Sequence, residues 1–458
     1  MRVLMQYSRL SYCSLNSLMT HFCSVWLSVV VALTMFDLKR RGQVGRLGLC
    51  GVNGKKFPAI RAHMTRAIAD TYSNLRGVVL DAVGNVDLQT FPADDRADPL
   101  AYREALKQFA PGDVAIIFTP DNTHFDIAMA CVEHGLHVMV TKPVVQTLAQ
   151  HAQLAARARE RGVLVGVEVH KRLDPIYVDA RDKIQQSLGA FSYIHAYMSQ
   201  PKYQLGTFRA WAGRDSDISY YLNSHHVDFH EWCVGNSARP VSVTALASTG
   251  VATQLVDHKS CEDTITLSVQ WEVFPEAEGG ISSLGSASYT ASWIAPRAEV
   301  HSQQRFFYMG HRGEVSVDQA HRGYGMAVDA AMGKPGDGYR SLNPLFMKYT
   351  PSRAGHFVGQ QGYGYRSFEA FLQAASSIVR GDSKAVDFDE VGASAAASHT
   401  ETGSVASIHD TFRTTAILEA GRRSLDSQNT IQIIYDPSQQ RSCLPLDLVV
   451  KPSGTLKL

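Results

Sequence analysis

The amino-acid sequence predicts an α/β domain with a parallel sheet, followed by an α+β domain with a largely antiparallel sheet. Strand-like and helix-like segments alternate from about residue 46 to residue 170, which is typical of a doubly wound α/β domain. From 240 to 318, β-like runs follow one another with turn residues between them, which indicates an antiparallel sheet. A length of 458 residues fits two domains, and we place them at 1–169 and 170–458.

The stretch from Val114 to Pro143 predicts a strand, a crossover helix and a second strand. An apolar run over 114–118 indicates the first strand, and either Asp121 or Thr123 can cap the helix that follows. The apolar side chains of that helix recur at i, i+3, i+4 and i+7, and they are Phe125, Ala128, Met129 and Val132. This pattern predicts one buried face packed against the sheet.

The second strand of this unit leads directly to a lysine. Gly135 is a suitable left-handed stop for the helix, and the strand 136–140 is followed by Thr141-Lys142-Pro143. Reactive groups in parallel sheets lie just past the carboxyl ends of the strands. Lys142 is therefore the first catalytic candidate, and the alternative is an exposed surface lysine. A further buried-looking strand, 162–169, contains Glu168 and is followed by His170-Lys171-Arg172.

The start of the chain departs from a dinucleotide-binding, Rossmann-like domain. Such a domain carries G-x-G-x-x-G after its first strand, where backbone N–H groups approach the pyrophosphate. Residues 2–5 can form that strand, but no glycine precedes Gly42. Gly48, Gly51 and Gly54 have a different spacing, and residues 46–58 indicate a second strand and its turn instead. The glycine loop is missing, and residues 1–28 are atypical.

The turn after the second strand bears on the cofactor. In this fold that strand end meets the adenosine ribose, where an acidic residue favours NAD. Asn53 stands there, and Lys55, Lys56 and Arg61 follow it. These residues would tolerate a 2′-phosphate, so we expect NADPH, with NADH as the alternative. A solvated basic turn would explain the same residues equally well.

Composition narrows the function classes. A net charge of +1 and 19% charged residues describe an ordinary globular protein and argue against nucleic-acid binding. The 7 cysteines are scattered and never paired as C-x-x-C, which fits reduced thiols in the cytoplasm. The apolar run 21–36 falls short of the ~20 residues that a membrane span needs. We expect a buried strand or helix there, no membrane anchor, and a flexible insertion at 392–406.

Several motifs occur in an order that resembles a known family. T-P-D-x-x-H at 119–124 precedes G-L-H-V-x-V-T-K-P at 135–143 and K-R-L-D-P at 171–175. With later stretches such as FRAWAGRDSDISYYLNSHHVD and TAILEAGRRSLD, the chain resembles the Gfo/Idh/MocA oxidoreductases over about residues 29–458. Within that family it is similar to a fungal D-galacturonate (uronate) reductase branch. The resemblance implies a nicotinamide-dependent oxidoreductase that reduces the aldehyde of a sugar acid.

The resemblance also implies catalytic residues. The family's motif lysine lies beside the reacting oxygen, which corresponds to Lys142, and burial can lower the pKa of a lysine to suit proton transfer. Thr141 stands where the family has glutamate, so we expect no glutamate–lysine pairing. The pattern D-x-x-x-H-x-x-D maps onto residues 221–228, where Tyr221 replaces the first aspartate and His225 is the expected proton donor. The adjacent His226 is the alternative register.

The remaining candidates bind rather than react. Thr119, Pro120 and His124 follow a strand end and are expected at the nicotinamide half of the cofactor, although His124 could instead cap a helix. Side chains expected to contact the substrate, including its carboxylate, are Arg172, Lys202, Arg209 and His226. His226 and His230 have H-x-x-x-H spacing, but a zinc site needs a third protein ligand. We therefore expect no metal.

Two rival functions share this fold. A non-catalytic cofactor- and sugar-binding regulator, or an inactive copy, would explain the missing glycine loop, whereas Lys142 and His225 favour the enzyme. A translated intron or a mis-joined exon would explain residues 6–28. The expected partner is a small sugar or sugar acid, and analogy with the family also allows a homo-oligomer.

Overall fold

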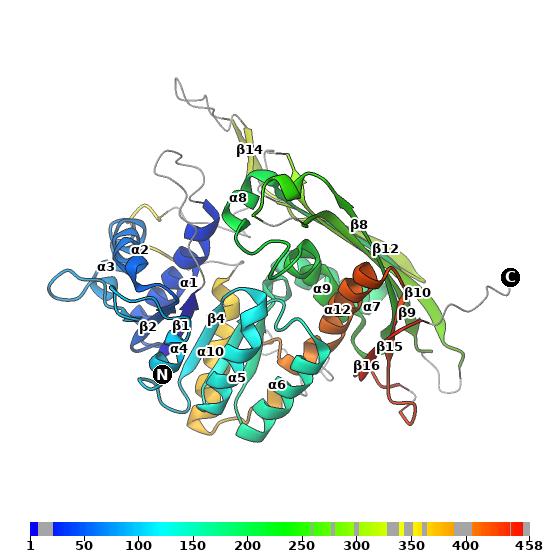
Figure 1. The fold of residues 1–458 in the computed structure, drawn as a ribbon, viewed down its shortest axis with the longest axis horizontal. Helices are drawn as coiled ribbons and strands as arrows, with labels where there is room; N and C mark the ends of the chain where they lie inside the picture. Colours follow the sequence, from blue (N-terminus) through cyan, green and yellow to red (C-terminus); the bar gives the residue numbers. More distant parts are fainter. Residues whose placement is uncertain are drawn as a thin grey trace. The chain divides into compact units, whose positions relative to one another are not determined.

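The computed structural model describes residues 1–7, 22–257, 260–275, 280–296, 302–327, 339–342, 351–359, 364–388, 405–439 and 441–451. The chain divides into two compact units, coloured along the sequence in Figure 1. Unit 1 comprises Met1–Val144, Ala152–Pro175 and Asn343–Ile408, and unit 2 comprises Val145–His151, Ile176–Leu342 and His409–Leu458. The domain boundary after residue 169 stays a prediction. Most of the insertion expected at 392–406 lies outside the described residues.

Unit 1 is built on a six-stranded parallel sheet with the order β3-β2-β1-β4-β5-β6. Its strands are β1 (Val3–Tyr7), β2 (Leu47–Gly51), β3 (Gln89–Phe91), β4 (Val114–Phe118), β5 (His137–Thr141) and β6 (Val165–Glu168). The apolar runs that predict strands are buried on both faces, as parallel sheets require. The predicted first strand is confirmed, and it lies between β2 and β4 at the centre of the sheet.

Helices cover this sheet. They are α1 (Phe22–Arg40), η1 (Gly54–Lys56), α2 (Phe57–Met64), η2 (Thr65–Ala69), α3 (Arg76–Val79), α4 (Ala101–Leu106), η3 (Asp121–Thr123), α5 (His124–Glu133), α6 (Leu148–Arg161), η4 (His170–Leu173) and α10 (Tyr365–Arg380). The apolar run 21–36 falls largely on α1, whose residues 31–38 join the core with α10. In Figure 1, α10 lies beside α1. Across the described ranges, no helix is long and apolar enough to cross a membrane.

Helix α5 forms where the sequence predicts it, but its buried face is rotated. The residues of α5 that are buried are His124, Ile127, Ala128, Cys131 and Val132. Phe125 and Met129, which were expected in the core, are only partly buried. The reason is that the helix begins at His124, whose imidazole is inserted under the strand ends. Gly135 ends the helix with φ +80°, as predicted.

Unit 2 is built on an eight-stranded mixed sheet with the order β12-β11-β7-β10-β9-β8-β15-β16. Among the described pairings of this sheet, β7 and β10 are parallel and the others antiparallel. The strands are β7 (Phe191–Pro201), β8 (Ala238–Thr249), β9 (Glu262–Val273), β10 (Ser283–Ala295), β11 (Gln303–Gly310), β12 (Gly313–Asp318), β15 (Ile431–Ile434) and β16 (Asp447–Val450). A separate hairpin pairs β13 (Tyr324–Ala327) with β14 (Tyr339–Leu342). The predicted antiparallel character is thereby confirmed.

Helices of unit 2 pack against this sheet, with α12 in contact with β8 and β15. They are α7 (Pro175–Ser187), η5 (Lys202–Gln204), α8 (Leu205–Phe208), η6 (Ser219–Asn223), α9 (Ser224–Val234), η7 (Gly235–Ser237), η8 (Ala252–Gln254), η9 (Ile408–Thr411) and α12 (Phe412–Ser427). A buried ion pair joins α9 to α12, with Arg413 Nε 3.0 Å from Glu231 Oε1. Thr414 donates to Glu231 Oε2 from its backbone nitrogen at 2.8 Å and from its hydroxyl at 2.6 Å. This carboxylate therefore fixes the register of two helices distant in sequence.

Candidate active site

Lys142 follows β5 immediately, at the carboxyl end of the parallel sheet of unit 1. Its side chain is half-buried. Desolvation lowers the pKa of Lys142 from 10.5 to about 8, while the negative charges of Asp121 and Glu168 act in the opposite direction. An amine with a pKa of about 8 exists in both protonation states near neutral pH, which suits a group that gives and takes protons.

A buried carboxylate lies at the end of the neighbouring strand. Glu168 is the last residue of β6 and is 5% exposed. Ser367 of α10 donates its hydroxyl to Glu168 Oε1 at 2.9 Å, and His170 Nδ1 lies 3.6 Å from Glu168 Oε2. Burial alone would raise the pKa of Glu168, but the charge and hydrogen bond of His170, the Ser367 hydroxyl and the Lys142 charge lower it. The carboxylate is held in its ionised form.

His124 links the ends of β4 and β5. Its Nδ1 lies 2.9 Å from the Pro143 carbonyl oxygen, and its Nε2 lies 2.9 Å from the Thr119 carbonyl oxygen. The ring is fully buried, so it contacts the main chain on both sides. Through the Pro143 contact, His124 also fixes the carbonyl group of the residue that follows Lys142. Direct contact of His124 with a cofactor stays a prediction, as it does for Thr119 and Pro120.

The turn after β2 has the place expected for the ribose end of a dinucleotide site. Asn53 Oδ1 accepts a hydrogen bond from the Lys55 backbone nitrogen at 3.1 Å and so caps η1. Lys55 is exposed. A Cβ on Gly54 would lie 1.9 Å from the Ala93 carbonyl oxygen, and one on Gly48 would lie 2.9 Å from the Phe109 ring. These glycines serve close packing, as expected for a strand and its turn.

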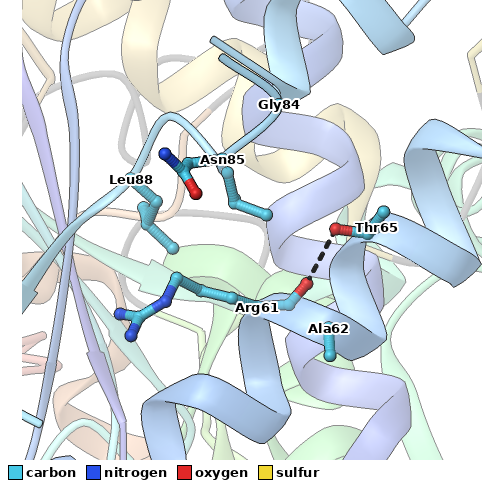
Figure 2. A pocket seen from close by; sticks show the side chains of 7 residues that line it. Arg61, Ala62, Thr65, Gly84, Asn85 and Leu88 are labelled. Carbon is cyan, nitrogen blue, oxygen red and sulfur yellow. Dashed lines mark hydrogen bonds between the residues drawn. The ribbon is translucent and has the colours of Figure 1, made fainter.

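A surface cavity of about 430 Å³ lies between α2 and the loop that precedes β3 (Figure 2). It is lined by α2, η2 and the loop before β3, through Arg61, Ala62, Thr65, Gly84, Asn85, Val86 and Leu88. Arg61 makes an ion pair with Asp94 and donates to Thr90 Oγ1 at 3.2 Å. The loop 84–88 precedes β3, whereas a dinucleotide binds beyond the carboxyl ends of strands. This cavity is therefore separate from Lys142, which is on the far side of three intervening strands.

The histidines of α9 lie within unit 2 and differ in their surroundings. His226 Nε2 lies 3.1 Å from the Tyr177 hydroxyl, and His230 Nδ1 lies 2.5 Å from the Tyr289 hydroxyl. His225 is 6% exposed. His226 and His230 are thus packed against aromatic residues of the core, and within the described ranges no group of three His, Cys, Asp or Glu could hold a metal ion.

The catalytic candidate Tyr221 and the substrate candidates Lys202 and Arg209 lie in unit 2. Tyr221 is half-buried, and its ring packs near Phe208 and Trp211, with centroids 5.2 Å and 5.7 Å away. Lys202 is exposed on η5. Arg209 is exposed, and its Nε lies 2.7 Å from Asp257 Oδ1. Their roles stay predictions.

Arg172 lies in η4 of unit 1 and is 6% exposed. It follows the same strand end as Glu168 and His170, so the carboxyl end of β6 carries both a buried carboxylate and buried cations. The sequence places Glu168 at this strand end, but Ser367 is almost two hundred residues away in the chain. No local pattern indicates that a serine of α10 would bind this carboxylate.

A parallel sheet of this order, with a titratable lysine past β5, defines a dinucleotide-binding fold with a catalytic candidate at the expected edge. Residues 47–169 match the family model described as "Oxidoreductase family, NAD-binding Rossmann fold" of the Gfo/Idh/MocA group. This match supports the predicted family over that range. It does not distinguish the galacturonate reductase branch.

Curated relatives match about a quarter of the chain. "Uncharacterized oxidoreductase YdgJ" of Escherichia coli (strain K12) is 32% identical over 118 residues, which cover 25% of this chain and 34% of that protein. "scyllo-inositol 2-dehydrogenase (NADP(+)) IolW" of Bacillus subtilis (strain 168) is 28% identical over 120 residues, which cover 25% and 33%. The alignment thus spans about a third of each of these relatives.

Solved structures match the fold over nearly the whole chain. GenD2 from gentamicin A biosynthesis, in complex with NAD, has a TM-score of 0.59 at 17% identity and covers 95% of this chain and 97% of its own. Myo-inositol 2-dehydrogenase from Lactobacillus plantarum has a TM-score of 0.59 at 16% identity and covers 94% and 99%. These likenesses confirm the predicted fold class of a Rossmann domain and a mostly antiparallel second domain.

Proposed function

We propose that this protein is an NAD(P)-dependent oxidoreductase acting on a sugar or sugar-acid substrate. The observation that carries the proposal is Lys142, a half-buried lysine beyond β5 whose pKa is lowered to about 8 by desolvation. Perturbed lysines at the carboxyl edge of a parallel sheet are candidates for proton transfer. The match of residues 47–169 to an NAD-binding oxidoreductase family supports the same activity.

The described residues at the strand ends fit a nicotinamide dinucleotide. After β2, Asn53 presents a neutral group and Lys55 a positive one. Neither residue is acidic, so neither would repel a 2′-phosphate on the ribose. Thr119 and Pro120 follow β4, and Lys142 follows β5, the parallel neighbour of β4. Residues 8–21, where a pyrophosphate loop belongs, lie outside the described residues. We propose NADPH as the cofactor, with NADH as the alternative that the NAD-bound neighbour GenD2 supports.

The proposed chemistry assigns one task to each residue. A bound nicotinamide dinucleotide would supply the hydride in the reducing direction and accept it in the oxidising direction. In the reducing direction, the Lys142 ammonium donates a hydrogen bond and then a proton to the developing alkoxide. In the oxidising direction, the neutral amine accepts the hydroxyl proton. His124 positions Lys142 by fixing the Pro143 carbonyl.

We propose His225 as the second proton donor, because it matches the histidine of the motif, with His226 as the alternative register. His226 lies beside the Tyr177 hydroxyl. Tyr221 replaces an acidic residue and offers a phenol hydroxyl to the substrate. We propose a uronate such as D-galacturonate as the substrate class, with Arg172 as its carboxylate-binding residue. The inositol dehydrogenase names of the relatives support a cyclic polyol as the second class.

A non-catalytic regulator on the same fold is the second candidate, and the absence of glycine before Gly42 favours it. The test is cofactor oxidation by the purified chain with NADPH and NADH against uronates, aldoses and inososes. In parallel, the purified chain is titrated with each cofactor to measure binding. Turnover of at least one substrate supports the enzyme. Cofactor binding without turnover of any substrate supports the regulator and contradicts the proposal.

A further inference from the structure

The carboxylate of Glu168 is more firmly held than a surface glutamate. It is 5% exposed, and contacts from two different elements fix both of its oxygens. Ser367 of α10 donates to Oε1 at 2.9 Å, and His170 Nδ1 of η4 lies 3.6 Å from Oε2. A buried carboxylate needs hydrogen bonds and a compensating positive charge to stay ionised. The Ser367 hydroxyl provides a hydrogen bond, and the His170 imidazole lies within ion-pair distance of the other oxygen.

The strand register places this carboxylate next to Lys142. β5 and β6 are parallel neighbours, and Thr141 lies opposite Glu168. Lys142 is the next residue after Thr141, so its backbone lies at the strand end adjacent to Glu168. The charges of Lys142 and Glu168 act on each other across these two strand ends.

We propose that Glu168 is a positioning residue for Lys142, held by Ser367 and His170 so that it keeps the half-buried ammonium charged and oriented. This inference deepens the proposed function, on which it rests for its catalytic meaning. Under this proposal, Lys142 has a glutamate partner although Thr141 replaces the glutamate of the family motif. The glutamate comes from the adjacent strand instead of the preceding residue.

Other charged groups face the same lysine. Asp121 of η3 acts on the pKa of Lys142 in the same direction as Glu168, and its effect is the larger of the two. Asp121 is only half-buried, so water and salt screen its charge more than that of Glu168. Lys171 and His170 lie on the same stretch as Glu168, and the charge of Lys171 lowers the pKa of His170. A test must therefore separate Glu168 from Asp121.

The test measures the titration of Lys142 without any substrate. Trace reductive methylation across a pH series, followed by peptide mass spectrometry, reports the neutral fraction of each lysine amine. In wild type, Lys142 should titrate near pH 8. Glu168→Gln keeps the shape but removes the charge, so the pKa of Lys142 should fall by about 1 pH unit, and labelling at pH 7 should rise several-fold. Ser367→Ala should lower the pKa of Lys142 by less than Glu168→Gln does.

Restoring the charge from the paired position makes the test sharper. Thr141→Glu in the Glu168→Gln background places a carboxylate opposite the lost one, and the pKa of Lys142 should return toward the wild-type value. Asp121→Asn is the comparison. Unchanged titration in Glu168→Gln, together with a lowered pKa in Asp121→Asn, would overturn the proposal and assign the role to Asp121.

This readout separates the inference from the proposed function. If no substrate is turned over but Glu168→Gln still lowers the pKa of Lys142, the coupling stands and the oxidoreductase proposal fails. If wild type is active and its pH–rate profile is the same in Glu168→Gln, the coupling fails and the oxidoreductase proposal stands. A thermal melt of each variant checks that it folds. If Glu168→Gln does not fold, Ser367→Ala tests the same contact.

Discussion

Replacing Lys142 with methionine should remove a stability cost that depends on pH. Desolvation lowers the pKa of Lys142 from 10.5 to about 8 in the folded protein. Below about pH 8 the amine is protonated in both the folded and unfolded states, and the full cost of the buried charge is present. Between pH 8 and 10.5 the unfolded chain binds a proton that the folded chain has released, so stability rises with pH. Above this window the cost disappears.

The size of the effect follows from the pKa difference. At 1.36 kcal/mol for each pKa unit, this one group raises the free energy of unfolding by about 2 to 3 kcal/mol from pH 7 to pH 10. Other groups also titrate in this range, so the comparison is between wild type and Lys142→Met. The variant should lack this part of the pH dependence and should be the more stable protein at pH 7.

The assay is urea unfolding at a series of pH values between 7 and 10, followed by circular dichroism and tryptophan fluorescence. Lys107→Met is the control, because Lys107 is exposed at the end of α4. It should keep the wild-type pH dependence. Parallel stability curves for wild type and Lys142→Met would refute the reasoning, since they would mean that the amine is as well solvated in the folded protein as in the unfolded chain.

Two further predictions concern the framework. Arg413→Met should destabilise unit 2 by about 3 to 5 kcal/mol in urea unfolding, because it leaves the buried Glu231 carboxylate without its cation. Arg380→Met, at the exposed Arg380–Asp382 pair, is the control and should cost less than about 1 kcal/mol; equal effects would contradict the account. Gly135→Ala should cost about 1 kcal/mol or more, because φ is +80° and the new Cβ would lie 3.0 Å from Pro111. A thermal melt checks this, and an unchanged melting temperature would contradict it.

The fold was largely predictable because its signals are local. Apolar runs bounded by glycine and proline predicted the parallel strands, and Gly135 ended α5 as expected. The buried face of α5 was not predicted correctly, because a polar residue, His124, occupies the core through two backbone hydrogen bonds. Periodicity counts apolar residues, so it assigned Phe125 and Met129 in place of Ile127 and Cys131.

The site was predictable where one residue follows one strand. Lys142 was predicted only from the general observation that reactive groups lie just past the carboxyl ends of parallel strands. The Glu168 contact did not follow, because it depends on the pairing of β5 with β6 and on Ser367 from a distant helix. The surroundings of His226 likewise depend on Tyr177 of α7. Such contacts are set by tertiary packing, which spacing within a motif does not show.

The most direct test of the central claim is the pH–rate profile of cofactor-linked turnover by wild type and Lys142→Ala. We predict that wild-type oxidation of the alcohol rises through a pKa near 8 and that reduction of the carbonyl falls through it. Lys142→Ala should lose the inflection and about 10²-fold or more in kcat, with cofactor binding retained. An Ala variant with wild-type kcat and the same inflection would contradict the account.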